Sequence, residues 1–297
     1  MSGTVFDIGY QRYTGIREGI NRARLAVFKD GLRIALGIGR GGRAKILPWF
    51  FIALLAGIAV VMVLVAGAAT RMAGPEAAEK IATFHGEYYG IVSIILFIFA
   101  ALGAPELLCR DRREGVINLY LVRPLTATDY LLGRWAAFLA VVLAVAWGPQ
   151  ILLFLGLLLD SPDPAEYLRT RWLDVPKFLA AGLALAVYTT TLAMLTASFT
   201  TRRAYASVFL VGLFVITTPF TVGLASETDG PLGQWISMFT LTNIPVHVND
   251  IIFGTVSEMT DDAPAGELAA WIRVAWYFAW TLIPGAILWV RYRRLTP

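Results

Sequence analysis

The chain has 297 residues, of which 57% are hydrophobic and 15% are charged, and its formal net charge is +4. Its mean hydropathy is +0.65. A soluble domain of this size carries about a quarter charged residues, because its surface must be hydrated. The composition therefore excludes an ordinary soluble globular protein and predicts a protein embedded in a membrane.

Six charge-free windows are each long enough to cross a bilayer as a helix. A hydrocarbon core about 30 Å thick needs about 20 apolar residues, since a helix rises about 1.5 Å per residue. The predicted spans are 46–70, 88–105, 135–159, 178–201, 204–226 and 274–290. The alternative, buried helices of a large soluble core, would give shorter windows that keep a polar stripe. We therefore expect an all-α membrane protein with six transmembrane helices.

The basic residues predict how these helices are oriented. Nineteen of the 25 Lys and Arg residues fall on the side of the amino terminus, and segment 227–270 on the other side has none. Because basic residues resist translocation, both termini are expected in the cytoplasm. A five-span topology, in which 88–105 does not cross, would place the basic cluster at 110–113 outside and is rejected.

The first 45 residues are predicted to form a cytoplasmic segment, followed by a transmembrane domain over 46–297. Residues 16–40 have the pattern of an amphipathic helix, which predicts a helix on the inner membrane surface. Its basic stripe consists of Arg22, Lys29, Arg33 and Arg40. Its apolar arc consists of Leu25, Phe28, Leu32, Ala35 and Leu36. Arg24 interrupts the apolar arc, which indicates that the helix lies partly against protein. The alternative is an ordinary basic flank of the first span.

No enzymatic or cofactor-binding motif stands out. The glycine run at 37–42 matches G-x-G-x-x-G, but a dinucleotide site needs a preceding strand and an acidic residue about 20 positions later. The pattern G-x-x-x-x-G-K-[ST] is absent from the sequence. His85 and His247 have no partners at metal-ligand spacing, and Cys109 is the only cysteine. We expect a chain without catalytic activity that binds neither cofactor nor metal.

The segment after the second span is the most informative part of the sequence. A charged cluster at 110–114 is followed by Gly115 and a short apolar run that ends at Pro124. Thr126-Ala-Thr-Asp129 then matches a capping box, which would start the next helix. The pattern predicts a short surface helix, a break, and a capped helix that re-enters the membrane.

This segment resembles the loop between the second and third spans of permease subunits of ABC type-2 exporters. Those permeases carry a pattern close to R-E-x-x-G-T-L-E-x-L-L-x-x-P, and residues 112–124 read R-R-E-G-V-I-N-L-Y-L-V-R-P. The spacing from glycine to proline is kept, and Leu131-Leu-Gly-Arg134 matches the following helix. Val116 and Asn118 replace the Thr and Glu of the family, and Glu114 directly precedes the glycine. The missing Glu puts in doubt any particular salt bridge to the ATPase.

The resemblance implies a mechanical role for the loop. It would form a coupling helix that docks on a separate cytoplasmic ATP-binding subunit, where ATP and Mg would be bound. The coupling residues would be Arg112, Arg113, Glu114, Gly115, Ile117, Asn118, Leu121 and Pro124. A second permease subunit, identical or homologous, and membrane lipids complete the expected partners, with no nucleic acid. The alternative is a charged inner loop that only obeys the positive-inside rule.

The predicted spans contain no Asp, Glu, Lys, Arg or His. Ion-driven transporters usually keep an ionisable group near the midplane, so the sequence favours an ATP-driven exporter. The alternatives are a secondary transporter or channel without an ATPase partner and, less in keeping with these spans, an intramembrane enzyme. Candidate residues of the substrate path are Tyr188, Thr189, Thr191, Thr217 and Thr218. These hydroxyls could instead bond to neighbouring helices or to their own backbone.

The outer loop 227–270 is acidic and contains one apolar stretch at 235–244. Ten residues are too few to cross the bilayer, so we expect a re-entrant or interfacial element that closes the outer mouth of a pore. Arg outnumbers Lys 21 to 4, which is typical of a GC-rich bacterial genome. The expected location is therefore a bacterial inner membrane, crossed several times.

Overall fold

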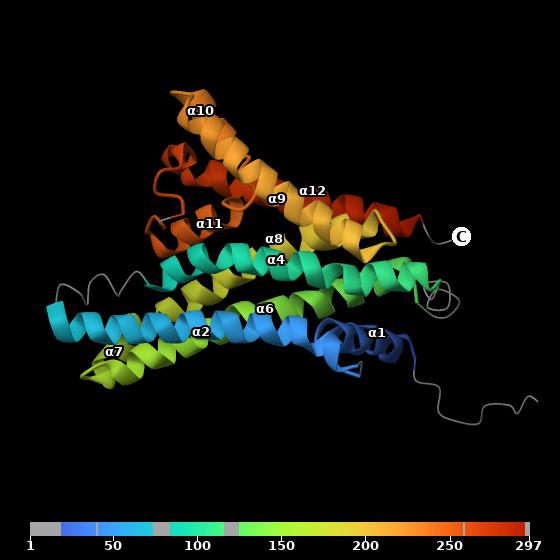
Figure 1. Cartoon of the computed structure of the whole chain (residues 1–297), viewed down its shortest axis with the longest axis horizontal. Helices are drawn as coiled ribbons and strands as arrows, with labels where there is room; N and C mark the ends of the chain where they lie inside the picture. Colours follow the sequence, from blue (N-terminus) through green and yellow to red (C-terminus); the bar gives the residue numbers. More distant parts are fainter. Residues whose placement is uncertain (1–18, 40, 74–83, 116–124, 258, 295–297) are drawn as a thin grey trace, which may run out of the picture.

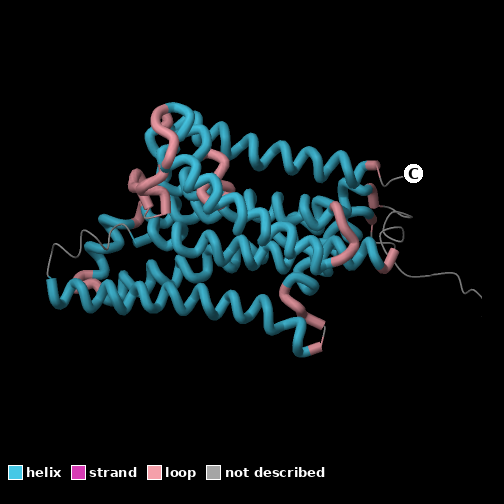
Figure 2. Tube along the Cα trace, turned by 45° about the horizontal axis from the view of Figure 1, so that its top comes forward, coloured by secondary structure: helices cyan, strands magenta, loops and turns pink. Residues whose placement is uncertain are grey.

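The computed structural model describes residues 19–39, 41–73, 84–115, 125–257 and 259–294. Every regular element in these ranges is a helix (Figures 1 and 2). In chain order they are α1 (Ile20–Ala35), α2 (Gly42–Ala73), α4 (Phe84–Arg113), α6 (Ala127–Asp160), α7 (Pro164–Arg171), α8 (Asp174–Ser198), α9 (Arg203–Ser226), α10 (Pro231–Ser237), α11 (Ile244–Phe253), the short 3-10 helix η1 (Pro264–Glu267) and α12 (Ala270–Arg293).

Six of these helices are long and apolar enough to cross a membrane: α2, α4, α6, α8, α9 and α12. They confirm the six predicted spans, and the chain is a multi-pass membrane protein. Most of the helices extend beyond the charge-free windows. α4 reaches Arg113 although its window ends at 105, and α6 starts at Ala127 although its window starts at 135. A charge marks the edge of the hydrocarbon core, whereas a helix continues until its backbone hydrogen bonds end.

α8 forms the centre of the bundle and packs against α4, α6, α11 and α12. Its Tyr188 is fully buried and its ring lies against the rings of Phe97 on α4 and Tyr277 on α12. α2 and α9 lie at the periphery (Figure 1) and expose most of their apolar side chains. Exposed apolar faces on such long helices suit contact with lipid chains.

The two ends of the bundle carry different elements. α1, the carboxyl end of α4 and the carboxyl end of α12 lie at one end, which we call the α1 end, and α7, α10 and α11 lie at the other (Figure 1). Figure 2 shows that most loops gather at these two ends. Both ends of the described chain therefore lie on one side, as six crossings require. That this side is the cytoplasm stays a prediction of the positive-inside rule.

The apolar stretch 235–244 of the loop before the last span does not form a single helix. α10 ends at Ser237, turns follow, and α11 starts at Ile244. α11 packs against α8, α12 and α4. Its Asn249 donates through Nδ2 to the carbonyl oxygen of Gly86 on α4 at 3.1 Å. Polar residues such as Asn249 and Asp250 obscured this helix in the sequence, and the partner of Asn249 on α4 is 163 residues away in the chain.

Candidate functional site

The segment between α4 and α6 begins and ends with well-defined local structure. α4 ends at Arg113, and the turn that follows contains Gly115, whose φ of +69° is a conformation that glycine adopts readily. The chain is described again from Leu125, and Thr126 caps α6. Its Oγ1 accepts from the amide of Asp129 at 3.1 Å, and Oδ2 of Asp129 accepts from the amide of Thr126 at 3.1 Å. The predicted capping box is confirmed, but four predicted coupling residues, Ile117, Asn118, Leu121 and Pro124, lie outside the described residues.

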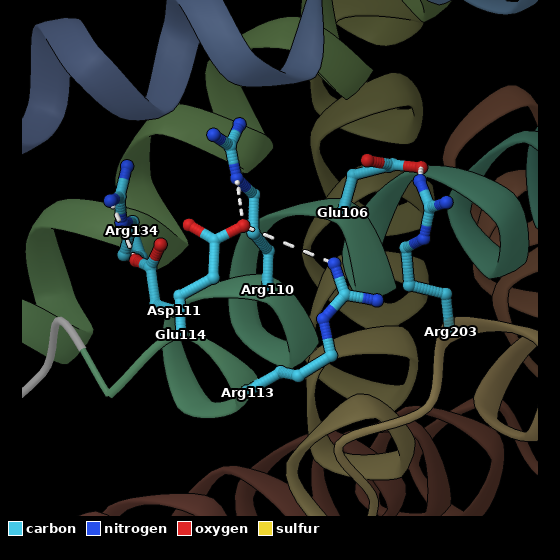
Figure 3. Close-up of polar contacts among 7 residues, drawn as sticks. All are labelled: Glu106, Arg110, Asp111, Arg113, Glu114, Arg134 and Arg203. Carbon is cyan, nitrogen blue, oxygen red and sulfur yellow. Dashed lines mark hydrogen bonds and ion pairs between the residues drawn. The ribbon is translucent and has the colours of Figure 1, made fainter.

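A buried ion network joins the two sides of this segment. Arg134 on α6 is 0% exposed, and its Nη2 lies 2.7 Å from Oδ2 of Asp111 on α4 (Figure 3). Its Nη1 lies 2.8 Å from Oδ2 of Asp30 on α1. The Tyr130 hydroxyl donates to the same oxygen of Asp111 at 2.6 Å. Removing a guanidinium from water costs several kcal/mol unless it is paired, so Arg134 holds α1, α4 and α6 in one relative position.

α1 lies against α6 through small residues. Val27, Gly31 and Ala35 are its buried positions, spaced by four residues and therefore on one face. A Cβ added at Gly31 would come within 2.6 Å of Cβ of Ala137 on α6, so only glycine permits this approach. Arg24 donates through Nε to Oδ1 of Asp129 at 2.7 Å, which explains why a basic residue interrupts the apolar arc.

The predicted amphipathic helix is present, but it spans Ile20–Ala35 rather than 16–40. Its positively charged residues Arg22, Lys29 and Arg33 are exposed, as the predicted basic stripe requires, and Arg40 lies outside the described residues. The contact of its remaining apolar residues with a membrane surface stays a prediction. The face that packs on protein contains Val27 and Gly31 together with Ala35 of the predicted apolar arc.

The charged residues at the end of α4 make three kinds of contact. Arg110 and Arg113 lie 3.1 and 3.9 Å from Oε1 of Glu114, and Glu106 pairs with Arg203 at the start of α9 (Figure 3). Arg112 instead donates to the carbonyl oxygen of Ser198, the last residue of α8. Arg113, Glu114 and Gly115 are exposed. Of the described coupling residues, these three are thus accessible to a partner, whereas Arg112 contacts the bundle.

Three of the five predicted path residues bond to their own helix. Thr189 donates to the carbonyl oxygen of Leu185, Thr191 to that of Val187, and Thr217 to that of Leu213. Thr191 also accepts from Nε1 of Trp135 at 3.2 Å. Threonine hydroxyls in a membrane helix can donate a hydrogen bond to a backbone carbonyl one turn earlier. This is the alternative that the sequence left open. Their contact with a substrate stays a prediction.

The other two path residues contact the outer loop. The Tyr188 hydroxyl donates to the carbonyl oxygen of Leu241 at 2.9 Å, and the hydroxyls of Thr218 and Thr242 lie 3.3 Å apart. Thr221, which the sequence did not single out, lies 2.8 Å from the hydroxyl of Thr240. In the sequence, only the alternating Thr240-Leu-Thr242 pattern pointed to these hydroxyl contacts. The pattern could be interpreted only once the structure placed this turn beside α9.

Among the described residues of the loop before the last span, the ionisable side chains of His247 and Asp250 are buried. Burial lowers the pKa of the His247 imidazole to about 4, and Arg273 acts in the same direction. Neither ring nitrogen of His247 has a hydrogen-bond partner among the described residues. Burial raises the pKa of Asp250, although hydrogen bonds from Thr260 and Ser257 oppose this effect. Among the described residues, no three His, Cys, Asp or Glu side chains are placed to hold a metal ion.

Comparison with known proteins adds one finding. A family model described as "ABC-2 family transporter protein" matches residues 67–290, about three quarters of the chain. The match includes α4, the following loop and all later helices up to Val290. A comparison with curated proteins finds no match.

Proposed function

The chain belongs to the ABC-2 transporter family, and we propose that it is the permease subunit of an ATP-driven exporter. In this proposal it works with a separate cytoplasmic ATP-binding subunit and a second permease subunit. The observation that carries the proposal is the family match over 67–290, which contains the loop whose glycine-to-proline motif resembles that of exporter permeases. The proposed location is a bacterial inner membrane, with the α1 end in the cytoplasm.

The proposed coupling runs through the end of α4. The exposed residues Arg113, Glu114 and Gly115, together with 116–124, would contact the ATP-binding subunit. Displacement of this loop would be passed to α1 and α6 because Arg134 forms ion pairs with both Asp30 and Asp111. The capping box adds stiffness where α6 begins, since it fixes the first turn of that helix. The network supports coupling because a loop that moved without α6 would have to break the buried ion pair between Asp111 and Arg134.

The proposed substrate path follows α9. Thr217 and Thr218 are partly exposed, whereas Tyr188, Thr189 and Thr191 are buried in the single chain. In a dimer of permeases, the exposed face of α9 would meet the partner or the substrate first. The buried three would then support the path rather than touch the substrate in this conformation.

The coupling proposal is tested by co-purification in mild detergent and by ATP hydrolysis. We expect an ATP-binding subunit to co-purify, and we expect Glu114→Arg with Ile117→Asp to abolish the stimulation of its ATPase. The matched control is Glu166→Arg with Leu168→Asp on α7, which reverses one charge and adds another at exposed positions of the opposite end. Unchanged transport and ATPase stimulation in the first double variant would show that the loop does not couple the subunits.

A further inference from the structure

A cavity of about 560 Å³ opens at the α1 end, between the carboxyl ends of α8 and α12 and beside that of α4. We propose that it binds the phosphate headgroup of an anionic phospholipid from the adjacent leaflet. Its lining residues include Arg112, Ser198, Phe199, Arg291, Tyr292 and Arg294. The proposal rests on the chain spanning a membrane and is independent of the ATP-binding partner.

The cavity is strongly basic. Three arginines line it and, among the described residues, no acidic side chain does. Arg112 and Arg291 both donate to the carbonyl oxygen of Ser198, the latter through Nε at 2.9 Å. Each guanidinium has five N–H donors arranged in a fork that suits phosphate. One shared carbonyl therefore uses only part of what the two groups offer.

Tyr292, which also lines the cavity, supplies an independent observation. Tyr292 is 1% exposed, and its hydroxyl has no hydrogen-bond partner among the described residues. Its ring stacks on that of Tyr130, with centroids 6.1 Å apart. Arginines near the end of a helix can be explained by the partial negative charge of its last carbonyl groups. An unpaired buried hydroxyl cannot, because its burial destabilises the protein until an acceptor such as a phosphate oxygen arrives.

The walls of the cavity favour a lipid over a soluble phosphate compound. Phe199, Ile287 and Val290 line it and remain 56%, 46% and 40% exposed. Ile287 and Val290 lie in the last turns of the α12 span, where a bilayer meets its headgroups. Basic groups at that depth attract anionic headgroups, and the exposed apolar walls can hold the upper part of the acyl chains.

A neighbouring cavity shows that arginines alone would not support this inference. It has a volume of about 650 Å³ and is lined by Arg110, Arg113 and Arg203, but also by Glu106 and Glu114. Its arginines pair with these two glutamates. Their charges are largely compensated within the protein, so the cavity between α8 and α12 is the one suited to an anion.

The test uses the purified full chain in neutral detergent, without an ATP-binding subunit. Phosphatidylglycerol, phosphatidylcholine and inorganic phosphate are added separately, and bound lipid is measured by native mass spectrometry and by the shift in melting temperature. We expect stabilisation by phosphatidylglycerol alone. Equal stabilisation by phosphatidylcholine or by inorganic phosphate would overturn the assignment to an anionic lipid.

Two variants locate the site. Arg294→Gln replaces an exposed side chain just beyond α12 and should weaken phosphatidylglycerol binding about fivefold, the effect of one basic residue near a membrane surface. Tyr292→Phe should also weaken binding while leaving the lipid-free melting temperature unchanged or higher, since it removes an unpaired hydroxyl. The control, Arg202→Gln, removes an exposed charge from the same end outside the cavity. The proposal is wrong if both variants bind as the wild type does, or if the control weakens binding equally.

Discussion

The α1 end of the bundle is joined by a buried ion network, whereas the opposite end is joined mainly by hydrogen bonds between neutral groups and by the partly exposed ion pair of Arg71 and Asp160. At the α1 end, Arg134 connects three helices through Asp30 and Asp111. At the other end, Asn249 donates to α4 and Thr240 and Thr242 face hydroxyls on α9. A full charge makes few, strong and directional contacts, and their loss leaves a buried charge behind. The contrast is in keeping with the coupling proposed for the α1 end.

The largest effect is expected where the ion network is broken. Arg134→Met removes the shared cation and leaves the buried carboxylate of Asp111 without its guanidinium. Breaking a buried pair in this way costs about 3–5 kcal/mol, so the melting temperature in detergent should fall sharply. Arg24→Met, which removes the half-exposed partner of Asp129, should cost less than about 1 kcal/mol. Similar losses in the two variants would show that burial does not distinguish these pairs.

The end opposite α1 should respond to pH through His247. Its pKa of about 4 in the folded protein lies below the ordinary value of about 6.5, so the unfolded chain binds the proton first. The contribution of this residue to stability is complete above about pH 6.5 and is lost as the pH falls toward 4, by up to about 3 kcal/mol.

This pH effect is measured as the difference in melting temperature between wild type and His247→Gln across pH 4–7. The raised pKa of Asp250 acts in the opposite direction and is present in both proteins, so the difference isolates His247. A difference that stays constant across this range would show that the imidazole does not titrate with folding.

The smallest effect concerns the contact between α1 and α6. Gly31→Ala places a methyl group 2.6 Å from Cβ of Ala137, and overpacking of this kind costs about 1–3 kcal/mol. Gly57→Ala on α2 meets nothing within 4 Å and should instead stabilise its helix by about 1 kcal/mol. Circular dichroism melts of the two variants should therefore shift in opposite directions. Shifts in the same direction would mean that α1 does not pack closely on α6.

Features that depend on neighbouring residues were predictable. The six spans followed from uninterrupted apolar windows, and the capping box followed from Thr126 and Asp129, three positions apart. The family resemblance also came from one continuous stretch, and the match over 67–290 supports it. The helix α11 was not predicted, because it contains polar residues such as Asn249, whose partner lies far away in the chain, on α4.

The sequence by itself determined that this chain crosses a membrane six times, because the cost of placing charges in hydrocarbon is paid locally, residue by residue. It also indicated that the segment after the second span begins with a charged cluster at 110–114. Only the tertiary structure decided what that cluster does: Asp111 contacts Arg134, Arg112 contacts Ser198, and Glu114 stays exposed. These contacts join positions 23 and 86 residues apart, so they depend on how the helices pack and have no local signature.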